Sequence, residues 1–447
     1  MKMGSLLIVN ATVVNEGEKF SADVYCRDGR IEEIGAALTH RQADTVIDAK
    51  GKLLMPGMID GQVHFREPGL TQKGDMATES RAAVAGGITT FMEMPNVNPP
   101  TINLQALEDK YARADGRAAA NYAFYLGATN DNLEDIQRLP KNKACGVKIF
   151  MGASTGSLLV DNVKTLEGIF ADAPILVATH CEDTPTILRN EELARQQYGD
   201  DIPIAMHPKI RSEEACYLSS SLAVSLAKRF GTKLHVLHLT TEKELELFAP
   251  GNVADKQISL EVCVHYLFFS EEDYAAKGNG IKCNPAIKRT EDRAALLAAV
   301  NNNVVDVIAT DHAPHLAEEK AWPFMQAPAG LPLVQHALPI LFELYSDGLL
   351  TVETIVEKTS HNVAKRFNVV DRGYIREGYW ADLVLIDTER PQLVTADNIL
   401  YKCGWSPFEG DSFRASVDTT IVNGEVVYQY GRSEPTPIVG RRVEFSQ

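Results

Sequence analysis

Five polar side chains stand out because each belongs to a different apolar segment of the chain. His64, His180 and His238 lie near the ends of three such segments. Asp311 ends a fourth segment, and Lys148 lies inside the apolar sequence GVKIF, where an unpaired ammonium group would be costly. Imidazole and carboxylate groups that converge in a pocket suit zinc or a neighbouring divalent metal. One such histidine alone is more simply a hydrogen-bonded structural residue, but five residues together favour a metal site.

The other histidines have no spacing typical of metal ligands. His40 lies in a polar loop, where we expect it to be exposed to solvent. We expect structural roles for the remaining ones, which are His207, His235, His265, His336 and His361.

The segments that carry these residues alternate with segments of helical character. Apolar runs that alternate with helices are typical of parallel strands buried on both faces. Eight such strands predict a (β/α)8 barrel, in which the carboxyl ends of the strands converge on one mouth. A doubly wound open sheet is the alternative, weakened by the absence of a G-x-G-x-x-G after the first strand and of a P-loop. The predicted strands are 57–65, 89–95, 121–129, 146–150, 174–182, 233–240, 258–266 and 305–314, and the predicted helices include 77–87, 104–119, 212–231 and 291–302.

Both ends of the chain look different from the middle, because short β segments there are separated by turns that carry glycine and charge. We therefore predict a small β-sandwich module built from 1–56 and 378–447, with the barrel over 57–377. The loop-like segments 153–162 and 315–326 are candidates to cover the barrel mouth.

The composition of the chain excludes some classes of binding partner and indicates a cellular compartment. The chain has 447 residues, is 45% hydrophobic and carries a net charge of −16, with a pI near 5.2. This acidity argues against nucleic acid or an anionic membrane as a main partner. No apolar run approaches the roughly 18 residues of a membrane helix, and no signal-peptide core is visible. Seven cysteines without a C-x-x-C pair predict reduced thiols in a cytoplasmic protein.

Eight motifs in order resemble those of the dihydroorotases, in the amidohydrolase superfamily. They are DGQVHFREPG (60–69), MEMPNVNPP (92–100), GVKIFMG (146–152), ATHCED (178–183), VLHLTT (236–241), KCNPAIK (282–288), ATDHAPH (309–315) and APAG (327–330). The resemblance implies a metal-dependent (β/α)8 barrel that interconverts N-carbamoyl-L-aspartate and L-dihydroorotate in pyrimidine synthesis. These small molecules are then the expected partners, and the resemblance is compatible with a homodimer.

The resemblance also implies roles for the five residues above. His64 would bind a first zinc ion, and His180 and His238 would bind a second. Lys148 would carry a CO2-derived carbamate that bridges the two ions, and Asp311 would bind the first ion and shuttle a proton. A carbamate would supply two anionic oxygens and remove the buried positive charge.

Substrate-binding residues follow from the same resemblance. Arg66 lies two residues past His64 on the same strand face, and its planar fork matches a carboxylate. A salt bridge between Arg66 and Glu67, or another carboxylate at the barrel mouth, is the structural alternative. The implied substrate-binding set is Arg66, Asn96, Asn284, His315 and the backbone around Ala329 and Gly330.

The sequence departs from the family pattern at Gln62. The first-strand motif of the family is His-x-His, and here it reads Gln62-Val63-His64. Gln62 and His64 share a strand face, so a ligand is replaced and not displaced. A glutamine amide is a weak or absent zinc ligand, but three strong ligands still make a usable zinc site. We therefore expect an active enzyme with a weakly held first metal.

Two other functions remain open. One is another cyclic amidohydrolase, such as an allantoinase or hydantoinase, on the same barrel. The other is a catalytically silent homologue that serves as a structural partner of aspartate carbamoyltransferase. Gln62 is the one feature that favours the silent homologue.

Overall fold

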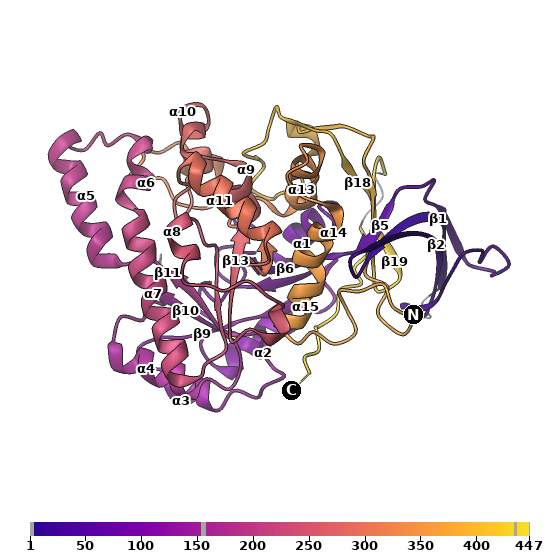
Figure 1. Cartoon of the computed structure of the whole chain (residues 1–447), viewed down its shortest axis with the longest axis horizontal. Coiled ribbons are helices and arrows are strands. Elements are labelled where there is room, and N and C mark those ends of the chain that lie inside the picture. Colours follow the sequence, from indigo (N-terminus) through magenta and orange to yellow (C-terminus); the bar gives the residue numbers. More distant parts are fainter. Residues whose placement is uncertain (1–3, 153–157, 433–435, 447) are drawn as a thin grey trace.

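A barrel with an attached β-sheet makes up the computed structural model, which describes residues 4–152, 158–432 and 436–446 (Figure 1). The predicted loop 153–162 therefore lies partly outside the described residues. The barrel occupies one side of the molecule, and the sheet lies at the other, where the amino terminus is found.

The barrel contains eight parallel strand positions in the described part of the chain. Hydrogen bonds run through β6–β7–β8 in one set and through β9 to β14 in the other. β8 continues into β9 after one residue, which joins the two sets. The strands are β6 (Met58–Val63), β7 (Ile88–Glu93), β8 (Asn121–Phe124) with β9 (Leu126–Gly127), β10 (Val147–Met151), β11 (Val177–Cys181), β12 (Leu234–Val236), β13 (Ile258–Cys263) and β14 (Val307–Ala309).

Backbone contacts between the first and last strands close the barrel. Val63 forms a parallel bridge with His312, and the His64 N–H donates to the His312 carbonyl oxygen at 2.7 Å. The Asp311 N–H donates to the Gln62 carbonyl oxygen at 3.0 Å. The residues predicted to do chemistry therefore lie on the same rim of the barrel, as the alternation of strands and helices predicts.

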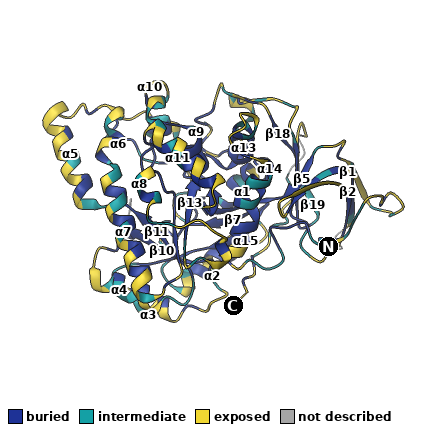
Figure 2. Ribbon diagram, in the orientation of Figure 1, coloured by how far each residue is buried: buried dark blue, intermediate teal, exposed yellow. Residues whose placement is uncertain are grey.

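Helices cover the outside of the barrel, with buried inner faces and exposed outer faces (Figure 2). Their starts are explained locally, as in the Ser212 side chain that accepts from the Ala215 N–H ahead of α7, which ends at a left-handed Gly231. The helices are α1 (Met76–Ala85), α2 (Leu104–Ala114), α3 (Leu133–Gln137), α4 (Val163–Asp172), α5 (Thr184–Tyr198), α6 (His207–Ile210), α7 (Glu213–Phe230), α8 (Glu242–Leu245), α9 (Val264–Phe268), α10 (Tyr274–Lys277), α11 (Thr290–Asn301), α12 (Ala317–Lys320), α13 (Ala337–Ser346), α14 (Val352–Val356) and α15 (Asn362–Arg366).

Both ends of the chain contribute to one eight-stranded sheet. Its order is β19-β18-β15-β5-β1-β2-β3, with β4 also paired to β1. Eight of the ten strands described within 1–56 and 378–447 thus belong to a single hydrogen-bonded sheet. The strands are β1 (Ser5–Asn15), β2 (Glu18–Arg27), β3 (Arg30–Gly35), β4 (Thr45–Asp48), β5 (Leu53–Pro56), β15 (Leu383–Asp387), β18 (Ser416–Val422) and β19 (Glu425–Gln429), and a separate hairpin pairs β16 (Gln392–Leu393) with β17 (Ser412–Phe413).

Several predicted strands are too long: 233–240 and 305–314 exceed β12 and β14, and 258–266 also runs into a helix. The apolar run 258–266 was expected to be extended throughout, but β13 ends at Cys263 and α9 begins at Val264. An apolar run has no periodicity that separates a buried strand from a buried helix, so the sequence could not mark this change.

The cysteines and the helices match two expectations from the sequence, which are free thiols and no apolar run of the length of a membrane helix. All seven cysteines are buried free thiols. None of the helices in the described part of the chain combines the length and apolar character needed to cross a bilayer.

A buried polar network joins the sheet to the barrel. Arg372 and Asp382 form an ion pair in which each side chain is only 3% exposed. Asp382 also accepts from the Asn121 amide of β8 at 3.1 Å and from the Asn423 N–H at 2.8 Å. The network therefore connects a barrel strand, the chain before β15 and the β18–β19 turn.

Removing the charge of Asp382 should destabilise the fold. In Asp382→Asn the buried Arg372 loses its counter-charge, and we expect the free energy of unfolding to fall by about 3–5 kcal/mol. The exposed pair Arg30–Asp371, at 2.8 Å, gives the control Asp371→Asn, for which we expect a loss of at most about 1 kcal/mol. Urea denaturation followed by circular dichroism measures both, and equal losses would contradict the prediction.

Candidate active site

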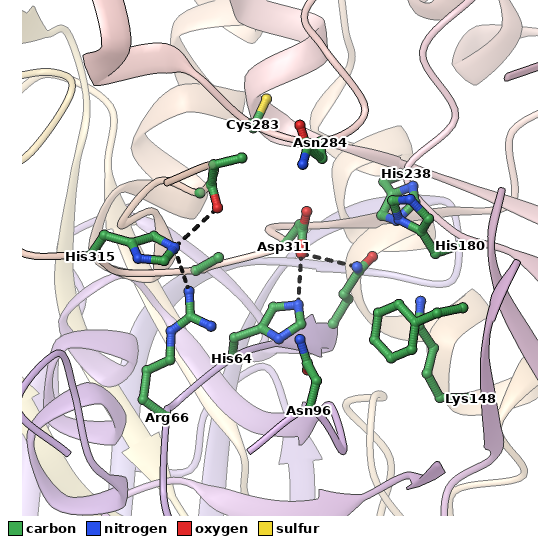
Figure 3. A pocket seen from close by; sticks show the side chains of 15 residues that line it. His64, Arg66, Asn96, Lys148, His180, His238, Cys283, Asn284, Asp311 and His315 are labelled. Atoms are coloured by element: carbon green, nitrogen blue, oxygen red, sulfur yellow. Dashed lines mark hydrogen bonds and ion pairs between the residues drawn. The ribbon is translucent and has the colours of Figure 1, made fainter. Parts of the chain in front are cut away.

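One cavity at the barrel mouth gathers all the residues singled out from the sequence (Figure 3). It also contains three that sequence reasoning missed. The predicted residues that line it are Gln62, His64, Arg66, Asn96, Lys148, His180, His238, Asn284, Asp311, His315, Ala329 and Gly330, and the additional ones are Phe150, Cys283 and Ala313.

The backbone presents several of these side chains from an uncommon conformation. Arg66, His238 and Asp311 have φ angles of 69°, 41° and 53°. Few non-glycine residues adopt positive φ, and such residues cluster at functional sites. Three separate strand ends therefore turn sharply where their side chains enter the cavity.

Lys148 is buried without a partner for its amine. The side chain of this β10 residue is 1% exposed, and its Nζ makes no hydrogen bond among the described residues. Nζ lies 4.6 Å from the ring centroid of Phe150. Burial lowers the pKa of Lys148 to about 8, so a substantial neutral fraction exists at mildly alkaline pH. The cavity thus contains a nucleophilic amine in place of a paired cation.

Two histidines face each other on one side of the cavity. His180 Nδ1 lies 2.9 Å from His238 Nε2. The other ring nitrogen of His180, Nε2, lies 3.0 Å from Glu182, which also pairs with Arg211. Burial would raise the pKa of Glu182, but the charge of Arg211 and the His180 hydrogen bond hold it at about 2. The ionised Glu182 accepts the Nε2 proton of His180, and the Nδ1 lone pair of His180 faces His238 Nε2.

A second pair lies across the cavity. His64 Nε2 is 3.2 Å from Asp311 Oδ1, and the Gln62 amide donates to the same oxygen at 3.0 Å. Burial would raise the pKa of Asp311, but the His64 hydrogen bond and nearby histidines hold it at about 2. Asp311 is therefore ionised at neutral pH. The side-chain oxygen Oε1 of Gln62 is buried and has no hydrogen-bond partner in the described structure.

These groups fit a metal only together with Lys148. No three His, Cys, Asp or Glu side chains in the described ranges converge closely enough to hold an ion. The two pairs and the amine line the same cavity, and the charge of Lys148 adds to burial, the largest cause, in lowering the pKa of His64, His180 and His238. The donor set is complete for a divalent metal if Lys148 contributes an anionic ligand.

Positive and amide groups line the other end of the cavity. Arg66 Nε donates to the Pro314 carbonyl oxygen at 3.1 Å, and burial lowers the pKa of this guanidinium to about 10. No salt bridge to Arg66 is present in the described residues, and Glu67 pairs instead with Arg117 at 2.6 Å. The amide oxygens of Asn96 and Asn284 are buried and unpartnered. This end of the cavity therefore offers polar groups that the protein itself does not satisfy.

The loop behind Ala329 and Gly330 is held by two buried lysines. Lys320 Nζ donates at 3.0 Å to the carbonyl oxygens of Lys282, Pro328 and Gly330. Lys282 Nζ donates at 2.6 Å to the carbonyl oxygens of Phe324 and Ala327. Burial lowers the pKa of Lys320 to about 7 and that of Lys282 to about 8. The segment 315–326, predicted to be loop-like, is therefore an ordered wall that includes the short helix α12.

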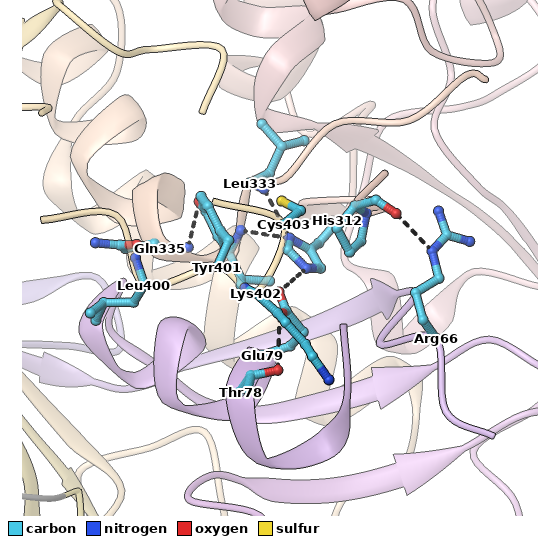
Figure 4. Close-up of polar contacts among 12 residues, drawn as sticks. Arg66, Thr78, Glu79, His312, Leu333, Gln335, Leu400, Tyr401, Lys402 and Cys403 are labelled. Atoms are coloured by element: carbon cyan, nitrogen blue, oxygen red, sulfur yellow. Dashed lines mark hydrogen bonds and ion pairs between the residues drawn. The ribbon is translucent and has the colours of Figure 1, made fainter. Parts of the chain in front are cut away.

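His312, which follows Asp311, does not line the cavity, and its ring instead contacts Glu79 and Leu333 (Figure 4). Its Nε2 lies 2.8 Å from Glu79 of α1, and its Nδ1 accepts from the Leu333 N–H at 2.9 Å. Glu79 also accepts from the Lys402 N–H at 3.0 Å. His312 therefore anchors the strand end that carries Asp311.

The histidines expected to be structural lie outside this cavity. His40 is exposed. His207, His235, His336 and His361 are buried and make hydrogen bonds to Cys283, Ser259, Tyr401 and Gly373, respectively. His265 is buried and packs on the Tyr266 ring at 3.9 Å.

The supporting residues carry weaker sequence signals than the cavity residues. Glu182 could have been found, because it follows His180 by two residues and shares its strand face. Phe150 follows Lys148 by two residues in β10 and carries the same signal, whereas Arg211 and Cys283 carry none, since their positions depend on the fold.

Comparison with known proteins agrees with this geometry. Residues 53–427 match the model of the amidohydrolase family. The chain is 32% identical to the dihydroorotase of Methanosarcina mazei, over 99% of this chain and 98% of that one. It is 33% identical to the allantoinase of Rubrobacter xylanophilus, over 97% and 96%. The structure of an L-hydantoinase (dihydropyrimidinase) from Arthrobacter aurescens superposes with a TM-score of 0.92 at 26% identity, over 99% of this chain and all of that one.

The chain belongs to the amidohydrolase family, whose members are generally metal-dependent. Within that family it is a cyclic amide hydrolase on a (β/α)8 barrel, as its full-length similarity to these enzymes indicates. The fold predicted from the sequence is confirmed.

Replacing Lys148 by methionine should stabilise the metal-free protein. The substitution removes a buried amine that has no partner, so we expect the free energy of unfolding to rise by about 1–3 kcal/mol. Lys110 is the control, because it is equally buried but pairs with Glu93 at 3.0 Å. For Lys110→Met we expect a loss of about 3–5 kcal/mol. Urea denaturation in the presence of a chelator measures both, and a large loss in Lys148→Met would show that its amine has a partner.

Proposed function

We propose that this protein is a dihydroorotase, which interconverts N-carbamoyl-L-aspartate and L-dihydroorotate. The observation that carries the proposal is the buried guanidinium of Arg66, which faces the cavity without a carboxylate partner in the described residues. Dihydroorotate has a carboxylate beside its ring, and a guanidinium fork binds a carboxylate through two parallel hydrogen bonds. Allantoin and simple hydantoins have no such group. The similarity to dihydroorotases agrees with this choice, although allantoinases are equally similar in sequence.

The metal would be Zn2+, one or two ions per chain. His180 and His238 would hold one ion and His64 and Asp311 the other, with a CO2-derived carbamate on Lys148 shared between them. Support for the carbamate comes from the buried amine, whose lowered pKa leaves it free to react with CO2. Such a metal supplies polarisation of the amide carbonyl and acidifies water, which together lower the barrier to ring opening.

Asp311 is the group that moves the proton. Because it is ionised, its carboxylate accepts a proton from the attacking water and returns that proton to the ring nitrogen that leaves the carbonyl carbon. His64 and Gln62 both contact Oδ1 of Asp311, which fixes the direction of the carboxylate.

At the other end of the substrate, Arg66 and His315 would hold the carboxylate. Asn96 and Asn284 would use their unpartnered amide oxygens on the polar edge of the ring. We further propose that the reaction serves pyrimidine synthesis in the cytoplasm, which agrees with seven buried free thiols.

Arg66 should decide the choice of substrate. For Arg66→Ala we expect kcat/KM with L-dihydroorotate to fall by about 10²-fold or more, because the buried substrate carboxylate loses its counter-charge. The exposed Arg113 of α2 gives the control Arg113→Ala, for which activity should not change. Turnover of L-dihydroorotate, allantoin and hydantoin is measured with all three proteins. Native turnover of allantoin or hydantoin as fast as that of L-dihydroorotate would contradict the proposal.

Gln62 should set the affinity for the first metal. Its amide donates to Asp311 and is a weaker ligand than imidazole, so we expect a chelator to remove zinc from the native protein in two stages. In Gln62→His the two stages should merge as the weaker site tightens. Gln105→His, on the exposed face of α2, controls for an added surface histidine. If the native protein binds no zinc and only Gln62→His is active, the chain is a silent homologue.

A further inference from the structure

Lys73 approaches the substrate cavity from behind His315. It lies in the loop between β6 and α1, and its side chain is 13% exposed. Its Nζ is 3.0 Å from His315 Nδ1 and 2.9 Å from Glu319 Oε1 of α12. Nothing in the motif analysis singled out Lys73 or Glu319.

These contacts determine where the proton of His315 lies. A lysine ammonium group can only donate, so the His315 Nδ1 beside it must be the acceptor. Glu319 cannot take a proton from Nδ1, because its nearer oxygen is 3.8 Å away. Burial, followed by the charges of Arg66, Lys73 and Lys320, keeps the pKa of His315 well below its usual value, so the ring is neutral. Its proton therefore sits on Nε2, which donates to the Ala329 carbonyl oxygen at 3.0 Å.

The position of this proton determines whether the Arg66 guanidinium can hydrogen-bond to the His315 ring. Arg66 Nη2 lies 3.1 Å from the same His315 Nε2. With the proton on Nε2 both atoms are donors, so the guanidinium makes no hydrogen bond to the ring. With the proton on Nδ1, the Nε2 lone pair would accept from Arg66 and would also face an incoming anion. Only the first arrangement leaves the Arg66 guanidinium free of the ring and able to bind a carboxylate, while the Nε2–H of His315 donates to the Ala329 carbonyl oxygen.

We propose that Lys73 is a positioning residue for the carboxylate subsite: it fixes the Nε2–H tautomer of His315 and so keeps Arg66 available to the substrate, while Glu319 balances its charge. The identity of the carboxylate rests on the proposed function. The tautomer of His315 does not, because it follows from contacts within the protein.

The experiment measures the tautomer first, without substrate. Long-range 1H–15N correlation spectra of the 15N-histidine-labelled protein distinguish protonated from unprotonated ring nitrogens, and His315→Gln assigns the signals. We expect Nε2–H in the native protein and in Lys73→Arg, which keeps a donor. We expect Lys73→Met to shift His315 toward Nδ1–H. Lys402→Met is the matched control, because Lys402 contacts Asp75 of the same loop at 2.7 Å but does not contact His315.

Kinetics then connects the tautomer to binding. In Lys73→Met the KM for L-dihydroorotate should rise about tenfold, the cost of one charge-assisted contact, while kcat stays within about threefold. Lys73→Arg should restore KM. A native Nδ1–H signal, an unchanged tautomer in Lys73→Met or a shifted tautomer with unchanged KM would each overturn the inference. If the tautomer shifts as expected but no protein turns over L-dihydroorotate, the proposed function fails and the role of Lys73 in fixing the tautomer stands.

Discussion

The cavity depends on one unfavourable burial, that of the Lys148 amine. A cation in an apolar strand normally has a partner, and here none lies within hydrogen-bond distance in the described residues. The free-energy cost of burying this amine falls at the cavity that holds the candidate catalytic residues. Two pairs of ligand-type side chains line the same cavity as the amine, and ionised Glu182 and Asp311 orient the imidazoles beside them. The fold therefore places an unpaired, reactive amine among side chains of the types that bind metals.

A second layer of charged residues orients the groups that line the cavity. Glu182 directs His180, Glu79 anchors the strand end of Asp311 through His312, and Lys73 directs His315. Each of these contacts fixes one imidazole in a single tautomer, which matters because a histidine with the wrong nitrogen protonated neither binds a metal nor donates to an anion. Charged residues behind the cavity lining therefore determine which histidine nitrogens carry protons.

Local signals in the sequence predicted the barrel and the five polar residues of its strands, whereas the substrate-binding residues came from the resemblance to dihydroorotases. Strand ends that carry His64, Lys148 or Asp311 are visible as polar residues that interrupt apolar runs. The residues behind them are not visible in this way: Lys73 and Arg211 lie in loops, and they meet their histidines only because the barrel closes. The end of β13 at Cys263 was missed for a related reason, since burial on all sides removes the periodicity that separates strand from helix.

The loop held by Lys320 and Lys282 has an evolutionary consequence. Both lysines grip it through main-chain carbonyl oxygens, which every amino acid possesses. The identity of the side chains between Phe324 and Gly330 can therefore change while the path of the loop is preserved. Such a loop suits a family in which one barrel serves several cyclic substrates. Its side chains can change with the substrate while the backbone of the barrel and the loop stays the same.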